Sequence, residues 1–136
     1  MNPVDPQVGD KLDSRRLAPI TRTDIVRYQG ASGDFEPIHH DEPFAREAGY
    51  EAPLVVGMLP AGILTAWAAE IFGPMHTRRT RIRWKAQVWP GDLLTCEGTV
   101  THVYAVDDER RVDLELACVK EDGVPVVAAW MTFVLP

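Results

Sequence analysis

Two side chains suited to acid–base chemistry, Asp34 and His39, stand five positions apart in a segment rich in glycine and proline. An imidazole titrates near neutrality, and a carboxylate beside it can orient it or hold a water molecule. Gly33 permits a tight backbone and Pro37 stiffens the turn between the two, so both side chains could point at one spot. Spacing alone leaves open a blander alternative, a loop aspartate that caps its own turn beside a surface histidine.

Gly57 is a second candidate, because it opens a long apolar segment that should be helical. The first N–H groups of a helix have no partner within it and lie at the positive end of its dipole. Without a side chain on Gly57, a ligand oxygen could approach these groups, which predicts an oxyanion hole. The alternative is that Gly57 only lets the chain enter a crowded core.

The elements that must position these residues follow from capping and turn signals. A helix over about 24–30, capped by Thr21 or Thr23, should precede the acid–base pair. The segment 30–40, which carries the pair, is expected to be a loop because of its glycines and prolines. The pair would therefore stand on a loop anchored by a helix on its N-terminal side.

Two further helices are expected after the loop. Asp41 can cap a short helix that ends at Gly49, and a long helix should cover 57–72. Only Thr65 and Glu70 are polar in the long helix, so it has no hydrophilic face and should be buried on all sides.

The rest of the chain alternates between apolar and polar residues as strands do. Strands are expected over 11–18, 77–89, 93–106, 110–120 and 124–135, with turns at Pro90–Asp92, Asp107–Glu109 and Asp122–Gly123. An antiparallel sheet that follows one buried helix predicts an α+β protein in which the sheet wraps around the helix, the layout of the hotdog fold. The short helices or a partner subunit would cover the remaining side, so a dimer is expected.

Composition sets further bounds. The chain has 136 residues, which suits one domain over 1–136, and its net charge of -6 makes nucleic acid and anionic membranes poor partners. The apolar run 54–69 is too short to span a bilayer, and no signal-peptide pattern precedes it. Cys96 and Cys118 fit neither a disulfide scaffold nor a zinc site, so a cytoplasmic protein without a metal is expected.

Several of these residues form one pattern, which is Tyr28-x-x-x-Ser32-Gly33-Asp34-x-x-Pro37-Ile38-His39-x-Asp41, then Gly57-Met58-Leu59, Ile82-Arg83-Trp84 and Val88-Trp89-Pro90-Gly91-Asp92-Leu93. It resembles the MaoC-like family of (R)-specific enoyl-CoA hydratases. The resemblance implies hydration of a trans-2-enoyl-CoA to a (3R)-hydroxyacyl-CoA, or the reverse. Asp34 and His39 would hold the water and the Gly57 N–H would bind the thioester oxygen. No cofactor is implied, because the thioester is the electron sink.

The resemblance also implies substrate contacts. They are expected from Ser32, Pro37, Val56 and Met58, with Arg83 and Lys85 as contacts to the phosphates of CoA. The basic cluster to which Arg83 and Lys85 belong could instead be a solvated outer strand face.

Two positions depart from the family pattern. Glu36 stands where asparagine is usual, and Val56 stands where histidine is usual. Together the two departures favour an unusual acyl group. Some two-subunit steroid-CoA hydratases of the family pair a catalytic chain with a non-catalytic one, so a heteromeric partner stays open beside a homodimer. Two rival functions stay open, a non-catalytic hotdog subunit and an acyl-CoA thioesterase.

Overall fold

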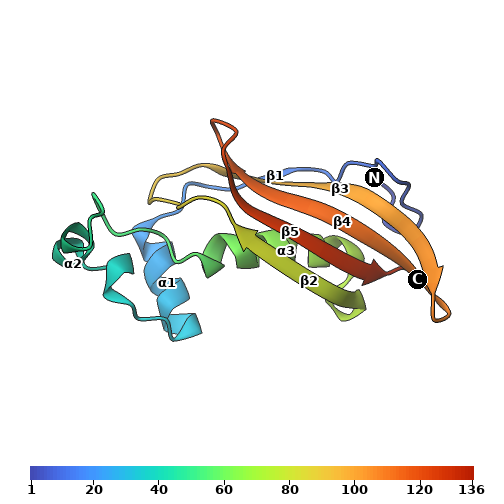
Figure 1. Ribbon diagram of the computed structural model, residues 1–136, viewed down its shortest axis with the longest axis horizontal. Helices are drawn as coiled ribbons and strands as arrows, with labels where there is room; N and C mark the ends of the chain where they lie inside the picture. The colour runs from blue at the N-terminus through green and yellow to red at the C-terminus, as the bar shows by residue number, and fades with distance from the viewer.

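The computed structural model describes residues 1–136 and contains one antiparallel sheet of order β1-β3-β4-β5-β2 with a long helix, α3, along its concave side (Figure 1). The elements are β1 (Arg15–Arg16), α1 (Arg22–Ser32), η1 (Pro37–His39), α2 (Glu42–Glu47), α3 (Met58–Phe72), η2 (Pro74–His76), β2 (Thr77–Trp84), β3 (Leu94–Val106), β4 (Glu109–Lys120) and β5 (Pro125–Val134). This is the α+β layout that the sequence predicts.

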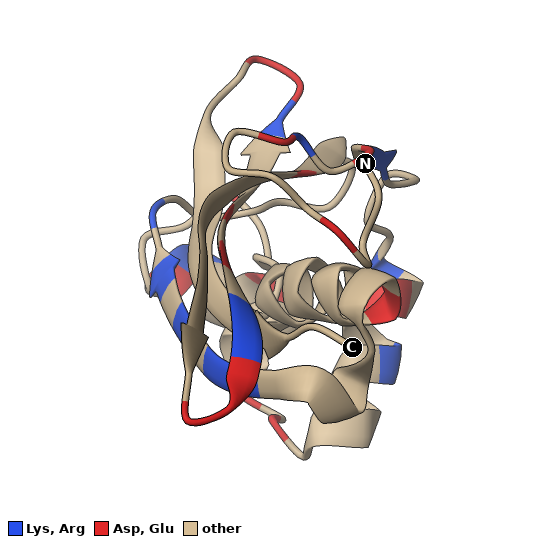
Figure 2. Ribbon diagram, turned by 90° about the vertical axis from the view of Figure 1, so that its right-hand side faces the viewer, with Lys and Arg blue, Asp and Glu red and all other residues tan.

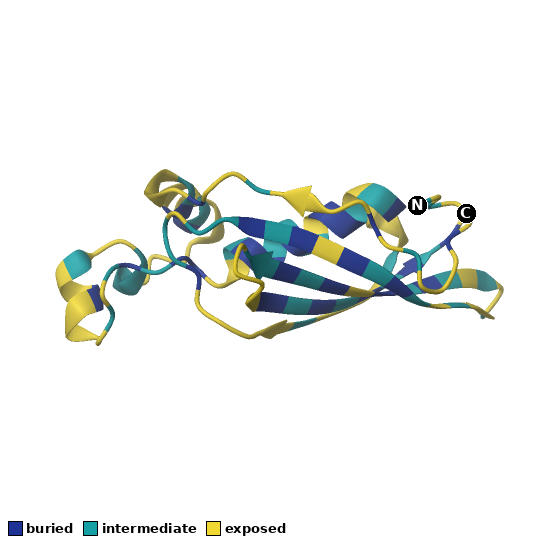
Figure 3. Ribbon diagram, turned by 90° about the horizontal axis from the view of Figure 1, so that it is seen from above, coloured by how far each residue is buried: buried dark blue, intermediate teal, exposed yellow.

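The core lies between α3 and the inward face of the sheet. Alternation along β4 buries Val112, Leu114, Leu116 and Cys118, and Figure 3 shows the same alternation along the neighbouring strands. Trp67 of α3 reaches β3 at Gly98, where an added Cβ would come within 2.7 Å of Leu116 and 3.4 Å of the indole. Gly98 therefore allows helix and sheet to approach closely.

One side of α3 is left uncovered by this chain, and it is the side for which the sequence predicts the short helices or a partner subunit as cover. Leu59 and Ile63 are only half-buried, while Ala66 and Glu70 are exposed. These four residues recur every three or four positions and so share one helical face. The sheet curls around the opposite face of α3. The helices α1 and α2 lie near one end of α3 and do not cover the whole length of its open face (Figure 1).

The predicted strand 77–89 is also too long. The ladder with β5 ends at Trp84, and β2 is a free edge strand with most side chains exposed on both faces. Basic residues gather on it, as Figure 2 shows. At the N-terminus, the expected strand 11–18 shrinks to β1 and one isolated bridge between Lys11 and Thr99.

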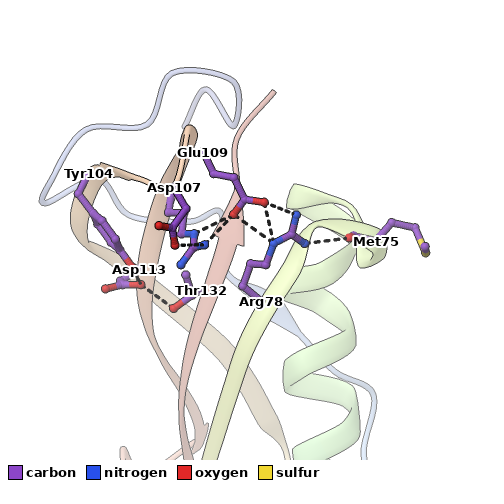
Figure 4. A network of polar contacts seen from close by, with 8 residues as sticks. Met75, Arg78, Tyr104, Asp107, Glu109, Asp113 and Thr132 are labelled. Carbon is purple, nitrogen blue, oxygen red and sulfur yellow. Dashed lines mark hydrogen bonds and ion pairs between the residues drawn. The ribbon is translucent and has the colours of Figure 1, made fainter.

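A polar network joins the start of β2 to the turn between β3 and β4 (Figure 4). The guanidinium of Arg78 binds Glu109 with Nη2–Oε1 and Nε–Oε1 distances of 2.7 and 3.1 Å, and Arg111 binds the same carboxylate at 2.9 Å. Both guanidinium groups keep the pKa of Glu109 below its usual range, the hydrogen bond from Arg78 being the larger cause.

Candidate active site

The loop that carries Asp34 and His39 leaves α1 abruptly and turns at once. Thr21 and Asp24 form a capping box at the start of the helix, and Gly33 ends it in the left-handed region at φ 74°. The helix is longer than predicted and takes in Gly30 to Ser32, and Pro37 begins a turn of 3₁₀ helix that ends at His39. Only 33–36 is therefore irregular.

The hydrogen bond of His39 fixes which of its nitrogens can act as a base. Its Nδ1 lies 2.8 Å from the carbonyl oxygen of Leu54. A carbonyl only accepts, so Nδ1 carries the hydrogen, and in the neutral ring Nε2 keeps a free lone pair. His39 is half-buried, and it is one of the residues that line a cavity between the loop, α3 and β2.

Asp34 is held differently. Its N–H donates to the Ser32 hydroxyl, and its carboxylate accepts the N–H of Glu36 at 3.3 Å. The side chain is exposed, makes no direct hydrogen bond to His39 and does not line the cavity. The structure thus places both groups on one short, hydrogen-bonded loop. His39 lines the cavity, whereas Asp34 lies at the N-terminal end of the loop and faces solvent.

Gly57 precedes α3 at the same cavity. The N–H groups of Gly57 and Met58 have no acceptor within the chain, and the first donor of the helix start that is bonded is the Leu59 N–H, to the carbonyl of Val56. The Gly57 carbonyl accepts the indole N–H of Trp84 at 2.8 Å, and a Cβ on Gly57 would lie 3.3 Å from the same nitrogen. Two free donors at a helix start are what a developing oxyanion needs.

The cavity encloses about 370 Å³. Its lining residues are His39, Leu54, Val55, Gly57, Pro60, Trp84, Lys85, Ala86, Gln87, Val88 and Val127. Most are apolar, and Lys85 carries the one formal charge among them, without an ion-pair partner. An apolar chamber with one imidazole, free amide hydrogens and one ammonium group fits an acyl compound with an anionic end.

The other expected contacts lie around this chamber rather than in its lining. Val56 is 2% exposed and belongs to the core, whereas Met58 at the start of α3 and Arg83 on β2 point to solvent. Ser32 ends α1 and Pro37 opens η1. Of the substrate contacts expected from sequence, Lys85 alone lines the cavity.

Two residues with clear roles in the site were missed by sequence reasoning. Trp84, which the sequence analysis names only as part of the family pattern, is 49% exposed and covers Gly57. Gln29, in the last turn of α1, is the one buried polar side chain and bonds the loop that carries Asp34 and His39. No spacing rule predicts the contacts of these two residues, because each contact depends on where another element ends.

The two cysteines are opposite one another on β3 and β4, both buried and free. The neighbouring Cys96 thiol and burial raise the pKa of Cys118. No cluster of three His, Cys, Asp or Glu side chains is placed to hold a metal ion. No helix has the length and apolar character that crossing a membrane requires.

Known proteins resemble this chain in sequence. Residues 4–121 match the family described as "MaoC like domain". The mitochondrial 3-hydroxyacyl-[acyl-carrier-protein] dehydratase FERN of Solanum lycopersicum is 29% identical over 96% of this chain and 78% of its own length. The (R)-specific enoyl-CoA hydratase of Rhodospirillum rubrum is 28% identical over 86% of this chain and 81% of its own length.

Solved structures share the fold. The (R)-hydratase from A. caviae superposes with a TM-score of 0.81 at 24% identity, covering 96% of this chain and 98% of that chain. The ChsH1–ChsH2 complex from Mycobacterium tuberculosis gives 0.80 at 24% identity over 96% and 98%. The chain therefore belongs to the MaoC-like domain family, with the hotdog fold. It is a hydro-lyase for hydration or dehydration of acyl thioesters.

Proposed function

We propose that the chain adds water across a trans-2-enoyl-CoA to give a (3R)-hydroxyacyl-CoA, and runs the reverse dehydration. The observation that carries the proposal is the bond from His39 Nδ1 to the Leu54 carbonyl. It leaves Nε2 as the basic nitrogen of a ring that lines the same cavity as Gly57, where two N–H groups are free.

In this reaction His39 takes a proton from the water through Nε2 while the oxygen bonds to the β-carbon. The electron pair of the double bond moves toward the thioester, and its carbonyl oxygen gains negative charge. His39 then delivers this proton to the α-carbon and returns to its starting state. Asp34, as a carboxylate on the same tied loop, accepts the other hydrogen of the water and orients it.

The free N–H groups of Gly57 and Met58 stabilise the charge on the thioester oxygen. The Met58 N–H is already held in place, since Trp84 bonds the Gly57 carbonyl of the same peptide group. Such donors contribute most in a chamber with apolar walls, where water does not screen them.

The acyl carrier is the next question, because relatives of both kinds exist, one named for acyl-carrier protein and one for CoA. Both carriers hold the acyl group on a pantetheine arm joined to a phosphate, but only CoA continues into a pyrophosphate and a nucleotide 3′-phosphate. Lys85 lines the cavity without a carboxylate partner, and exposed Arg83 lies two residues before it on the free edge. Both residues are placed to meet these phosphates, and CoA is the carrier we assign.

We further propose that the working unit contains a second hotdog chain. The uncovered face of α3 exposes apolar side chains. The free edge of β2 leaves backbone hydrogen-bonding groups without a partner strand. A homologous fold occurs in a complex of two different chains, ChsH1 and ChsH2. The second chain is a copy of this one or a homologous subunit.

The test is an assay with crotonyl-, octenoyl- and steroid-side-chain enoyl-CoA, following loss of the enone absorbance and the chirality of the product. Formation of the (3R)-alcohol from one of these substrates is the expected result. Release of free CoA without a hydroxyacyl product would identify a thioesterase. Inactivity alone, with activity restored by a homologous hotdog subunit, would identify a partner-dependent chain.

A further inference from the structure

Gln29 is the one polar or charged side chain that the fold buries, with 3% of its surface exposed. Burial of an amide is unfavourable unless each of its polar atoms finds a partner. All its partners lie on the loop that carries Asp34 and His39, although Gln29 itself belongs to the last turn of α1.

The amide makes three hydrogen bonds to this loop. Nε2 lies 2.9 Å from the carbonyl oxygen of Asp34 and 3.3 Å from that of Glu36. Oε1 lies 3.1 Å from Nδ1 of His40. The amide is therefore hydrogen-bonded to both ends of the loop, at Asp34 and at His40 next to His39.

The partners settle the orientation of the amide. Carbonyl oxygens only accept, so the NH₂ group must face Asp34 and Glu36. The amide oxygen then faces His40, whose Nδ1 must carry a hydrogen to complete the contact. Both N–H donors and the oxygen are used, and no buried side-chain polar atom of the protein lacks a partner.

The backbone adds a second tie at the same place. The Gln29 carbonyl accepts the N–H of Gly33, which ends α1. One residue thus fixes the turn out of the helix through its backbone and the conformation of 34–40 through its side chain. No other side chain bonds the carbonyls of Asp34 or Glu36.

We propose that Gln29 is a positioning residue of the hydration reaction: through Asp34, Glu36 and His40 it sets the distance between the Asp34 carboxylate and the His39 imidazole. This inference rests on the proposed function. A misplacement of about 1 Å at a reacting group costs about 10²-fold in rate. Loss of the Gln29 amide, which is bonded to both ends of the loop, should therefore lower the rate of the reaction.

Two variants test the inference. Gln29→Met keeps the length of the side chain and removes all of its side-chain hydrogen bonds. Gln29→Glu keeps the shape of the side chain and removes the two N–H donors of the amide. Both are expected to lower kcat for the enoyl-CoA about 10- to 100-fold, with KM within about twofold because no contact to substrate is removed. A purely structural role would leave kcat of the folded enzyme unchanged.

Ile25→Ala is the matched control. Ile25 lies in the same helix, is 1% exposed and bonds nothing in the loop through its side chain. Truncation should lower the free energy of unfolding by about 2–5 kcal/mol without altering kcat. If Gln29→Met and Gln29→Glu keep kcat within twofold of wild type, or if Ile25→Ala loses as much kcat as they do, the positioning role is wrong.

A readout without substrate separates this inference from the proposed function. Nitrogen NMR of the imidazoles should show the Nδ1–H form of His40 in the wild-type chain and a mixture of forms in Gln29→Met. Loss of hydration by the wild type with these spectra intact would refute the proposed reaction and leave the contact standing. Identical His40 spectra in both proteins would overturn the contact itself.

Discussion

The properties of His39 come from one neighbour rather than from its own sequence position. The Leu54 carbonyl takes the hydrogen of Nδ1, and the ring can then act only through Nε2. Sequence reasoning located Asp34 and His39 by their spacing and family resemblance. It did not find Gln29, because a glutamine in a helix looks like surface until the partners of its amide are known.

Gly57→Ala tests the proposed oxyanion hole. The added Cβ would lie 3.3 Å from the Trp84 indole nitrogen, tight enough that the indole or the Gly57 peptide must shift. Removal of one oxyanion donor costs about 10²–10³ in kcat, and a displaced donor should cost less, about tenfold. Steady-state kinetics with an enoyl-CoA measure the change.

Gly62→Ala is the control for this substitution. Gly62 lies in the same helix, and nothing stands within 4 Å of a Cβ placed there. The exchange should stabilise α3 by up to about 1 kcal/mol and leave kcat unchanged. Equal kcat in Gly57→Ala and Gly62→Ala would remove Gly57 from the reaction.

At the scale of elements, α1 supports the loop that carries Asp34 and His39. Its start was predicted with two possible caps, and the structure selects Thr21, whose hydroxyl accepts the N–H of Asp24 at 3.1 Å. Its end was predicted too early, since Gly30 does not stop the helix and Gly33 does. A glycine marks a helix end only where the backbone turns left-handed, which spacing does not reveal.

Thr21→Ala should therefore lower the free energy of unfolding by about 1 kcal/mol, because the Asp24 N–H loses its acceptor. Thr23→Ala, within the first turn and without a side-chain hydrogen bond, should change it by less than about 0.5 kcal/mol. Urea denaturation followed by circular dichroism measures both. Equal losses would show that the capping box does not stabilise α1.

The link between β2 and the β3–β4 turn predicts a pH effect. Arg78 and Arg111 hold the pKa of Glu109 below its value in the unfolded chain. The carboxylate thus contributes stability above the unfolded pKa and loses it as pH falls through the folded pKa. Denaturation below about pH 5 should show stability declining with acidity, and Glu109→Gln should flatten that decline.

Glu47→Gln is the matched control, because Glu47 is exposed on α2 and has no ion-pair partner. It should leave the pH dependence of the free energy of unfolding as in the wild type. A decline that is equally steep in the wild type and in Glu109→Gln would contradict the assigned role of the Arg78–Glu109 pair.

At the scale of the whole molecule, the arrangement of a sheet around one apolar helix follows from the alternation of residues and from the missing polar face of α3. The extent of burial does not follow from it. A helix without a polar face must be covered, but the sequence cannot say whether the same chain or another one covers it. Here Leu59, Ile63 and Ala66 stay partly open, which is why a second chain belongs to the proposal.

The most direct test of the central claim, that Asp34 and His39 act on one water, is kcat for enoyl-CoA hydration by Asp34→Asn and His39→Gln. Both exchanges preserve shape, and Asp34 makes no contact in the core. We expect kcat to fall by about 10²–10⁴ in each, with the free energy of unfolding nearly unchanged. Hydration at the wild-type rate by either variant would contradict the account.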